Sequence, residues 1–308
     1  MKKNKRILIV GGTGFIGFYL AKKCLSKKWT VVSFSKNIPR KVRYLKNVKY
    51  IKGDLSIKKD LEVLTQSFDY VVNLGGYVDH KNKEKTFSSH YVGCKNLSNF
   101  LINKNIKSFI QLGSSGEYGK IKSPQKEKSI GNPKSFYTRA KFLATNHLMG
   151  LYKKKEFPVT ILRLYQAYGP KQDINRFIPI IIDACIKKKI FDCSDGKQFR
   201  DFVHVEDVVA AIIKSIENSE VKGEILNIGT GKPKKIKDII TFLVKRLKGG
   251  TPNFGKIKLR SDEMTKIYPD ITKVKKFLKW SPKIKFTKGL EDTVRYYEKN
   301  KNKLSKIH

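Results

Sequence analysis

A glycine-rich loop near the N-terminus constrains this chain more than any other feature. The loop, GGTGFIG at residues 11–17, follows the apolar run RILIV at 6–10 and opens a segment with helical periodicity at 15–28. Such a loop is typical of dinucleotide-binding domains. Its first glycine permits a tight turn, its second lets a pyrophosphate approach the N–H groups of the helix start, and its third lets the helix pack on the sheet. The expected cofactor contacts in the loop are Gly11, Gly14, Phe15, Ile16 and Gly17.

Short apolar runs alternate with helical segments through the first half of the chain. Residues 86–104 and 137–154 have helical periodicity, as residues 15–28 do. This alternation predicts an α/β fold with a doubly wound parallel sheet, covered by helices on both faces and connected by right-handed crossovers. The predicted strands are residues 6–10, 30–34, 48–54, 70–76, 107–115 and 158–164.

The alternation loosens after about residue 165, which predicts two domains. We expect a Rossmann-type dinucleotide-binding domain over 1–165 and a smaller α/β lobe over 166–308, interleaved with the first. The lysine-rich tail at 297–308 is expected to fray. In the second half the predicted helices are 173–189, 205–218, 236–247 and 270–278, and the predicted strand is 224–229.

The formal net charge of +40 raises the question of a nucleic-acid or anionic-membrane partner. The excess is mainly lysine and is spread along the whole chain. No arginine-rich block or aromatic–basic array of the kind that nucleic-acid-binding proteins carry stands out. We therefore interpret the charge as a general lysine bias and do not expect a nucleic-acid partner. A basic cleft would still attract a phosphorylated substrate.

Cysteine spacing and apolar patterns bear on the cellular compartment. The four cysteines show no C-x-x-C pair and no metal-ligand spacing, so reduced thiols and no metal site are expected. The apolar runs are shorter than the roughly 18 residues that a membrane-spanning helix needs. The basic N-terminus lacks the long apolar region of a signal peptide. These features favour a cytoplasmic protein without a membrane partner.

The acid that grips the adenosine ribose in many NAD-binding domains is absent from the end of the second predicted strand. Ser35 and Lys36 stand there, and Asp54 is the first acidic residue of the chain. Hydroxyl groups and cations can hold a 2′-phosphate that an acid would repel, so this end favours NADP over NAD and leaves both open. Asp54 comes too late for the ribose and is expected beside the adenine. The cofactor contacts expected here are Ser35, Lys36, Asp54, Leu55 and Leu74.

Tyr137 and Lys141 are four residues apart in the predicted helix 137–154, so they share one helix face. A tyrosine with an ordinary pKa of about 10 is a poor acid–base catalyst at neutral pH. A neighbouring ammonium group and a positive nicotinamide ring would lower that pKa, and both residues are expected to contact the cofactor. Ser114 and Ser115 end the preceding strand, where a hydroxyl can hydrogen-bond the reacting oxygen of a substrate.

Seven short motifs follow one another along the chain, namely GGTGFIG, GDL, LGSSGEYG, YTRAK, LRLYQAYGPKQ, RDFVHVEDVV and LNIGTG. In this order they resemble the extended short-chain dehydrogenase/reductase family of nucleotide-sugar epimerases, dehydratases and ketoreductases, over nearly the whole chain. The resemblance implies a Rossmann domain that binds NAD or NADP and a C-terminal lobe that holds a nucleoside-diphosphate sugar. It also implies a homodimer, formed through the helices that start near Thr86 and Tyr137.

The same resemblance implies roles for individual residues. Ser114, Tyr137 and Lys141 match the catalytic triad, in which the tyrosine is the acid–base and the lysine orients it and binds the nicotinamide ribose. Arg200 resembles a ligand of the sugar nucleotide, and Arg260 resembles the arginine that holds the diphosphate. The substrate-binding residues expected on this basis are Ser115, Gln166, Arg176, Arg200 and Arg260.

Several positions depart from the family pattern. Dehydratases of the family carry an acid-bearing pair directly after the catalytic serine or threonine, where this chain has Ser115 and Gly116. Glu117 follows one place further on, so a shift in register stays open, but the pattern disfavours a dehydratase. Gly116 also replaces a cysteine that helps GDP-fucose synthases to epimerise. Gln166 and His90 each stand where asparagine is common.

Two reactions fit these residues. In a sugar 4-ketoreductase, NADPH donates a hydride to a C4 ketone while Tyr137 supplies the proton. In a 4-epimerase, resident NAD removes the C4 hydride and returns it to the other face. The missing ribose acid favours NADPH and reduction, with epimerisation left open. The alternative is a non-catalytic NAD(P)-binding or nucleic-acid-binding member of the same fold, which the complete triad argues against.

Overall fold

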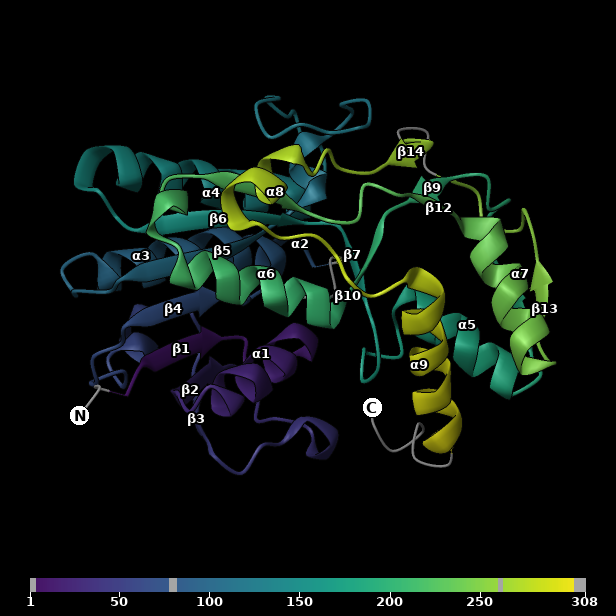
Figure 1. The fold of residues 1–308 in the computed structure, drawn as a ribbon, viewed down its shortest axis with the longest axis horizontal. Coiled ribbons are helices and arrows are strands. Elements are labelled where there is room, and N and C mark those ends of the chain that lie inside the picture. The colour runs from purple at the N-terminus through teal and green to yellow at the C-terminus, as the bar shows by residue number, and fades with distance from the viewer. Residues whose placement is uncertain (1–3, 78–81, 260–262, 302–308) are drawn as a thin grey trace.

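The computed structural model describes residues 4–77, 82–259 and 263–301. A seven-stranded, wholly parallel sheet forms its centre (Figure 1). The sequence prediction of a doubly wound parallel α/β fold is therefore confirmed. In their order across the sheet the strands are β11 (Ile225–Ile228), β6 (Val159–Leu164), β5 (Ser108–Ser114), β4 (Tyr70–Asn73), β1 (Arg6–Val10), β2 (Thr30–Ser35) and β3 (Val48–Lys52).

Strand β1 shows how the sheet is buried on both faces. Its side chains alternate between the faces, as the two-residue period of a strand requires. Ile7 and Ile9 pack into the core beneath α1 (Phe15–Ser26) and α6 (Val205–Glu217). Leu8 and Val10 pack into the opposite core, beneath α3 (Gly93–Leu101) and α4 (Phe136–Lys155). A strand buried on both faces reads as a continuous apolar run, which explains RILIV.

The long helix predicted over 86–104 contains a change of pitch. The chain runs as α2 (Lys83–Phe87), then as the π-helical turn η3 (Ser88–Val92), and then as α3. At the start of α3, a Cβ on Gly93 would come within 2.7 Å of the Leu55 side chain, so this helix lies close against the loop after β3. Single π turns inside helices often occur at functional sites.

The second half of the chain builds a smaller lobe with its own core (Figure 1). Strand β11 and helix α6 from this half complete the large sheet and its cover. Helix α8 (Thr272–Leu278) packs against β11. The other elements are α5 (Phe177–Ile186), α7 (Ile236–Leu247), α9 (Phe286–Lys299) and three small sheets, namely β7 (Gln166–Tyr168) with β10 (Phe202–His204), β8 (Ile190–Asp192) with β13 (Thr251–Asn253), and β12 (Lys234–Lys235) with β9 (Phe199–Arg200) and β14 (Lys266–Ile267).

The C-terminal helix α9 corrects a prediction. The tail from residue 297 was expected to fray, but Tyr297 is buried and its hydroxyl donates to the carbonyl of Gln172. Helix α9 continues to Lys299, and residues 302–308 lie outside the described part. The helix predicted from residue 173 begins only at Phe177. In the described ranges, no helix is both long and apolar enough to cross a membrane.

Candidate active site

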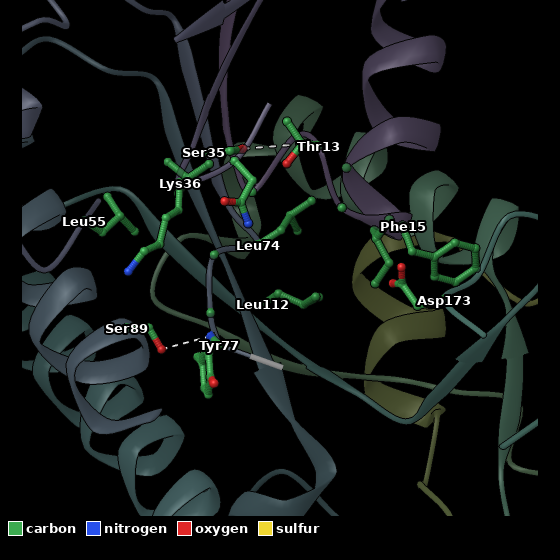
Figure 2. Close-up of a pocket in the computed structure, with 18 of the residues that line it drawn as sticks. Thr13, Phe15, Ser35, Lys36, Leu55, Leu74, Tyr77, Ser89, Leu112 and Asp173 are labelled. Carbon is green, nitrogen blue, oxygen red and sulfur yellow. Dashed lines mark hydrogen bonds between the residues drawn. The ribbon is translucent and has the colours of Figure 1, made fainter. Parts of the chain in front are cut away.

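A cavity of about 890 Å³ opens at the carboxyl ends of the central strands, between the large sheet and the segment before α5 (Figure 2). Its size is in the range of known small-molecule and cofactor sites, about 300–1,000 Å³. It brings together most of the residues predicted for cofactor and substrate. The predicted residues that line it are Gly11, Gly14, Phe15, Ile16, Gly17, Ser35, Lys36, Asp54, Leu55, Leu74, Tyr137, Gln166 and Arg176.

The glycine loop forms one end of the cavity. Gly11 has a φ of +74°, and its carbonyl accepts from the N–H of Gly14 at 3.0 Å, which closes the tight turn. A Cβ on Gly17 would lie 2.4 Å from the Gly11 carbonyl oxygen, so the close packing of helix and loop requires glycine. No side chain caps α1, whose first N–H groups therefore stay available for an anion. This cradle fits the pyrophosphate of a dinucleotide.

The ribose end carries a charge pair that the sequence did not predict. Lys36 Nζ lies 2.7 Å from Asp54 Oδ2, and the other oxygen of Asp54 accepts from the N–H and Oγ of Ser56. Burial would raise the pKa of Asp54, but the hydrogen bonds from Lys36 and Ser56 outweigh it and hold that pKa below its ordinary value. The Ser35 Oγ accepts from the N–H of Thr13 at 3.4 Å (Figure 2). Asp54 therefore neutralises the cation that follows Ser35 in the sequence.

Tyr137 lines the same cavity from the first turn of α4. The side chain of Ser135 caps this helix by accepting from Thr138 N at 3.2 Å. Ser114, the last residue of β5, lies close enough to the Tyr137 hydroxyl to lower its pKa, against the larger effect of burial. Strand β5 and the start of α4 thus bring together two of the three predicted catalytic residues.

The pKa of Tyr137 departs from the sequence prediction. Burial of the phenol raises the pKa of Tyr137, and the nearby Ser114 and the charge of Arg176 only partly oppose this. A lowered pKa was predicted from Lys141 together with a positive nicotinamide ring, whereas among the chain's own groups burial outweighs the lowering effects of Ser114 and Arg176.

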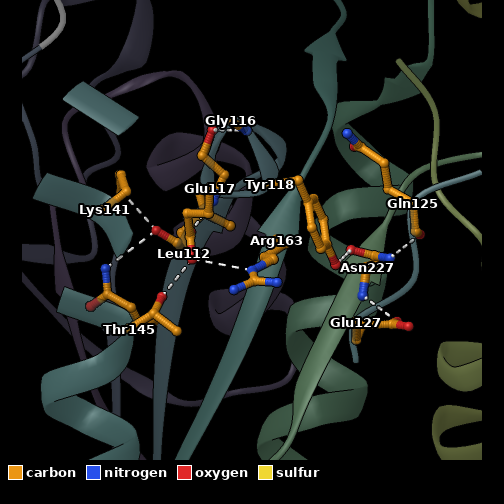
Figure 3. A network of polar contacts seen from close by, with 12 residues as sticks. Leu112, Gly116, Glu117, Tyr118, Gln125, Glu127, Lys141, Thr145, Arg163 and Asn227 are labelled. Carbon is orange, nitrogen blue, oxygen red and sulfur yellow. Dashed lines mark hydrogen bonds and ion pairs between the residues drawn. The ribbon is translucent and has the colours of Figure 1, made fainter. Parts of the chain in front are cut away.

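Lys141 lies one helical turn further along α4, at 5% exposure. Its Nζ donates to the carbonyl oxygen of Leu112 in β5 at 2.7 Å, and burial lowers the pKa of this amine (Figure 3). The lysine therefore ties α4 to the sheet behind Tyr137. Ser114, Ser115 and Lys141 are not themselves among the lining residues of the cavity.

Glu117 points into the core and not into the cavity. It is fully buried, and one carboxylate oxygen accepts from Ser114 N at 2.7 Å while the other accepts from Thr145 Oγ1 at 2.8 Å and Arg163 Nε at 3.1 Å (Figure 3). The register question left open by the sequence is thereby answered. Glu117 caps the turn η4 (Ser115–Tyr118) and is not placed to act on a substrate.

A polar network extends from Glu117 towards the second lobe (Figure 3). The Arg163 guanidinium lies 4.4 Å from the centre of the Tyr118 ring. The Tyr118 hydroxyl donates to Asn227 Oδ1 at 2.8 Å, and the amide of Asn227 donates to the carbonyl of Gln125 at 2.9 Å. Burial raises the pKa of Tyr118 to about 12, so its hydroxyl stays a donor at neutral pH. The network pins the segment after β5 to β11.

The predicted arginine ligands of the second lobe are not all in the cavity. Arg200 is buried, and its guanidinium pairs with Glu263 and donates to the carbonyl of Phe199 at 2.7 Å. Arg260 lies outside the described residues. The acids of the same RDFVHVEDVV motif are structural. Asp201 accepts from Thr230 N at 2.7 Å, and Asp207 accepts from Lys283 N at 2.9 Å.

Among the cavity residues that the sequence prediction did not include, Arg40, Arg43 and Asp173 form a charged group. Arg40 and Arg43 each place a guanidinium nitrogen 3.0 Å from the same oxygen of Asp173, and Arg43 Nε also donates to the carbonyl of Lys171 at 3.1 Å. We call this group the Asp173 bridge. It joins the loop after β2 to the segment before α5, across one side of the cavity. The paired arginines in PRKVR and the acid in PKQD are visible in the sequence, but their pairing is not.

Comparison with known proteins places this geometry in a family. The model of the NAD dependent epimerase/dehydratase family matches residues 7–229. A dTDP-D-glucose 4,6-dehydratase of Dictyostelium discoideum is 31% identical over 73% of this chain, which spans 58% of that protein's length. A UDP-N-acetyl-alpha-D-glucosaminuronate decarboxylase of Bacillus cytotoxicus is 27% identical, with 97% of this chain and 99% of that protein covered. The crystal structure of a Thermotoga maritima UDP-glucose 4-epimerase with UDP-glucose superposes with a TM-score of 0.90 at 25% identity, covering 96% of this chain and 99% of that one.

Proposed function

The chain belongs to the NAD-dependent epimerase/dehydratase family, and from this premise we propose that it is a nucleotide-sugar 4-epimerase that retains NAD. The observation that carries the proposal is that Tyr137 lines the same cavity as the glycine cradle. Epimerisation at C4 needs one acid–base and no second acid. Because the carboxylate of Glu117 pairs with Arg163 inside the core, this residue does not supply the extra acid that a dehydratase needs.

The chemistry of the chain's own residues is proton transfer and orientation. Burial raises the pKa of Tyr137, and the positive charge of a bound nicotinamide would oppose this rise. Tyr137 would then take the proton of the sugar 4-hydroxyl as that carbon is oxidised and return it when the carbon is reduced. Ser114, close to the Tyr137 hydroxyl, would donate to the same sugar oxygen and hold it in place. A nicotinamide bound between the cradle and Tyr137 supplies acceptance and return of hydride. The partly exposed Arg176 and the exposed Gln166 line the cavity and are proposed to contact the sugar nucleotide.

A second candidate, a sugar 4-ketoreductase that uses NADPH, is favoured by one observation. Ser35, and not an acid, ends β2, so nothing at that position repels a 2′-phosphate. The pairing of Lys36 with Asp54 weakens this argument because the cation is already neutralised. The homodimer expected from the sequence stays a proposal, which the exposed Phe136 and Leu143 on α4 support.

The bound nucleotide separates the two candidates. We expect the purified protein to release close to one equivalent of NAD on denaturation, identified by mass spectrometry, and to convert a nucleotide sugar to its C4 epimer without added cofactor. A protein that is empty and reduces 4-keto sugars with NADPH would establish the ketoreductase instead. Failure to bind either dinucleotide at micromolar concentration would contradict both candidates.

The Asp173 bridge is proposed to retain the cofactor between turnovers. Arg43→Ala removes a nearly buried guanidinium and with it the bonds to Asp173 and Lys171. Because the two loops would then part more readily, and a cation would leave the cavity wall, we expect bound NAD to dissociate roughly tenfold faster. The release rate is measured by trapping free nucleotide with a dehydrogenase.

The matched control for this change is Arg295→Ala. Arg295 pairs with Glu291 on the exposed face of α9, outside the cavity lining. Its removal is expected to leave the release rate unchanged. Equal release rates for Arg43→Ala and Arg295→Ala would show that the Asp173 bridge does not retain the cofactor.

A further inference from the structure

His90 lies against the proposed acid–base. It is only 7% exposed, and its ring contacts the ring of Tyr137 edge to face, with centroids 5.0 Å apart and planes at 73°. Aromatic pairs in this geometry attract one another beyond the effect of burial. The contact joins the π-helical turn η3 to the first turn of α4, so the position of Tyr137 depends on a residue 47 places earlier in the chain.

The π-helical turn also contacts the backbone of the loop that follows β4. The N–H of Tyr77 donates to Ser89 Oγ at 2.9 Å (Figure 2), and the carbonyl oxygen of Tyr77 lies 3.2 Å from His90 Nε2. The side chains of Ser89 and His90 thus contact the backbone N–H and the backbone carbonyl of Tyr77, respectively. Gly76, Tyr77 and Ser89 line the cavity, as Tyr137 does.

The imidazole is seated directly on the backbone of this loop. A Cβ at Gly76 would lie 1.9 Å from His90 Cε1, so any side chain there would occupy the place of the ring. The φ angle of Gly76 is not in the left-handed region, and the glycine is therefore required for space. The His90 ring therefore packs between this loop and the Tyr137 ring, and a shift of the loop or of Tyr137 would displace His90.

We propose that His90 is a positioning residue that holds the Tyr137 ring at the angle at which its hydroxyl meets Ser114 and the sugar oxygen. The proposal depends on the proposed function, in which Tyr137 is the acid–base. It follows from three contacts that converge on one ring, namely the aromatic edge of Tyr137, the carbonyl of Tyr77 and the backbone of Gly76. Small displacements of a reacting group lower rates strongly, whereas substrate affinity depends on other contacts.

A double-mutant cycle tests this proposal. His90→Ala is expected to lower kcat roughly tenfold and to change KM less than about twofold. In a Tyr137→Phe background the same change should lower the residual rate less than about twofold, because the hydroxyl that His90 positions is already gone. His90→Asn keeps a donor for the Tyr77 carbonyl but has no ring, and it should lose as much activity as the alanine variant.

Several outcomes would overturn the proposal. One is an equal loss from His90→Ala in both backgrounds, and another is a His90→Asn variant with the parent kcat. His147→Ala is the matched control. His147 lies in α4 outside the cavity lining, and its Nε2 lies 3.0 Å from Ser98 Oγ. Its replacement should leave kcat unchanged. Full activity of the Tyr137→Phe variant would contradict the proposed function. Equal losses from His90→Ala in the two backgrounds would contradict only the positioning role of His90, so the two failures can be told apart.

Discussion

Replacement of Tyr137 by phenylalanine is expected to lower kcat by roughly 10²-fold or more, because the change removes the only hydroxyl proposed to carry the proton. The ring, its edge contact with His90 and the fold of α4 are retained. The change leaves the glycine cradle intact, so the affinity for NAD should stay within about twofold. Turnover is measured on the nucleotide sugar, and NAD binding is measured by calorimetry on stripped protein.

Tyr152→Phe supplies the matched control for this experiment. It removes a hydroxyl from the same helix, at a residue that packs against Gly223 and not against the cavity. Its kcat is expected to equal that of the parent protein. Normal turnover by the Tyr137→Phe variant would exclude the proposed acid–base and with it the mechanism.

Replacement of Glu117 by alanine is expected to have the largest effect on stability. The change leaves the Arg163 guanidinium buried without its counter-charge and leaves Ser114 N and Thr145 without their acceptor. Breaking a buried ion pair by removal of one partner lowers the free energy of unfolding by about 3–5 kcal/mol. Equilibrium unfolding in urea, followed by circular dichroism, measures the loss.

Asp292→Ala tests whether this loss is specific to the buried pair. Asp292 pairs with Lys288 on an exposed helix face, and such pairs contribute about 0–1 kcal/mol. We expect the free energy of unfolding of this variant to lie within about 1 kcal/mol of that of the parent protein. A similarly small change for Glu117→Ala would contradict the structural role assigned to Glu117 and would reopen its role as an acid.

Local patterns predicted the parts of the site that short-range physics builds. The cradle at residues 11–17 follows from glycine spacing between a strand and a helix, and its φ angle, missing cap and close packing all agree with that spacing. Tyr137 and Ser114 were found because a helix start and a strand end each place a side chain at the sheet's carboxyl edge.

Long-range charge pairing could not be predicted. Asp54 was expected beside the adenine, and Lys36 was expected to be available for a phosphate, but the two pair with each other. Arg200 was expected to bind substrate, and its pairing with Glu263 was not foreseen. In a chain with many basic and few acidic side chains, each carboxylate could form an ion pair with any of several basic residues. Only the fold decides which of them it meets.

The sequence by itself determined the parallel sheet, the dinucleotide cradle and the identity of the proposed acid–base. Periodicity and glycine conformation act over a few residues and are therefore visible in the residue order. The tertiary structure alone decided that Glu117 serves the core, that His90 supports Tyr137 and that Arg43 spans the cavity to Lys171, 128 residues away. Those roles depend on which buried groups meet once the helices pack. A buried polar group must find a partner wherever the fold places one.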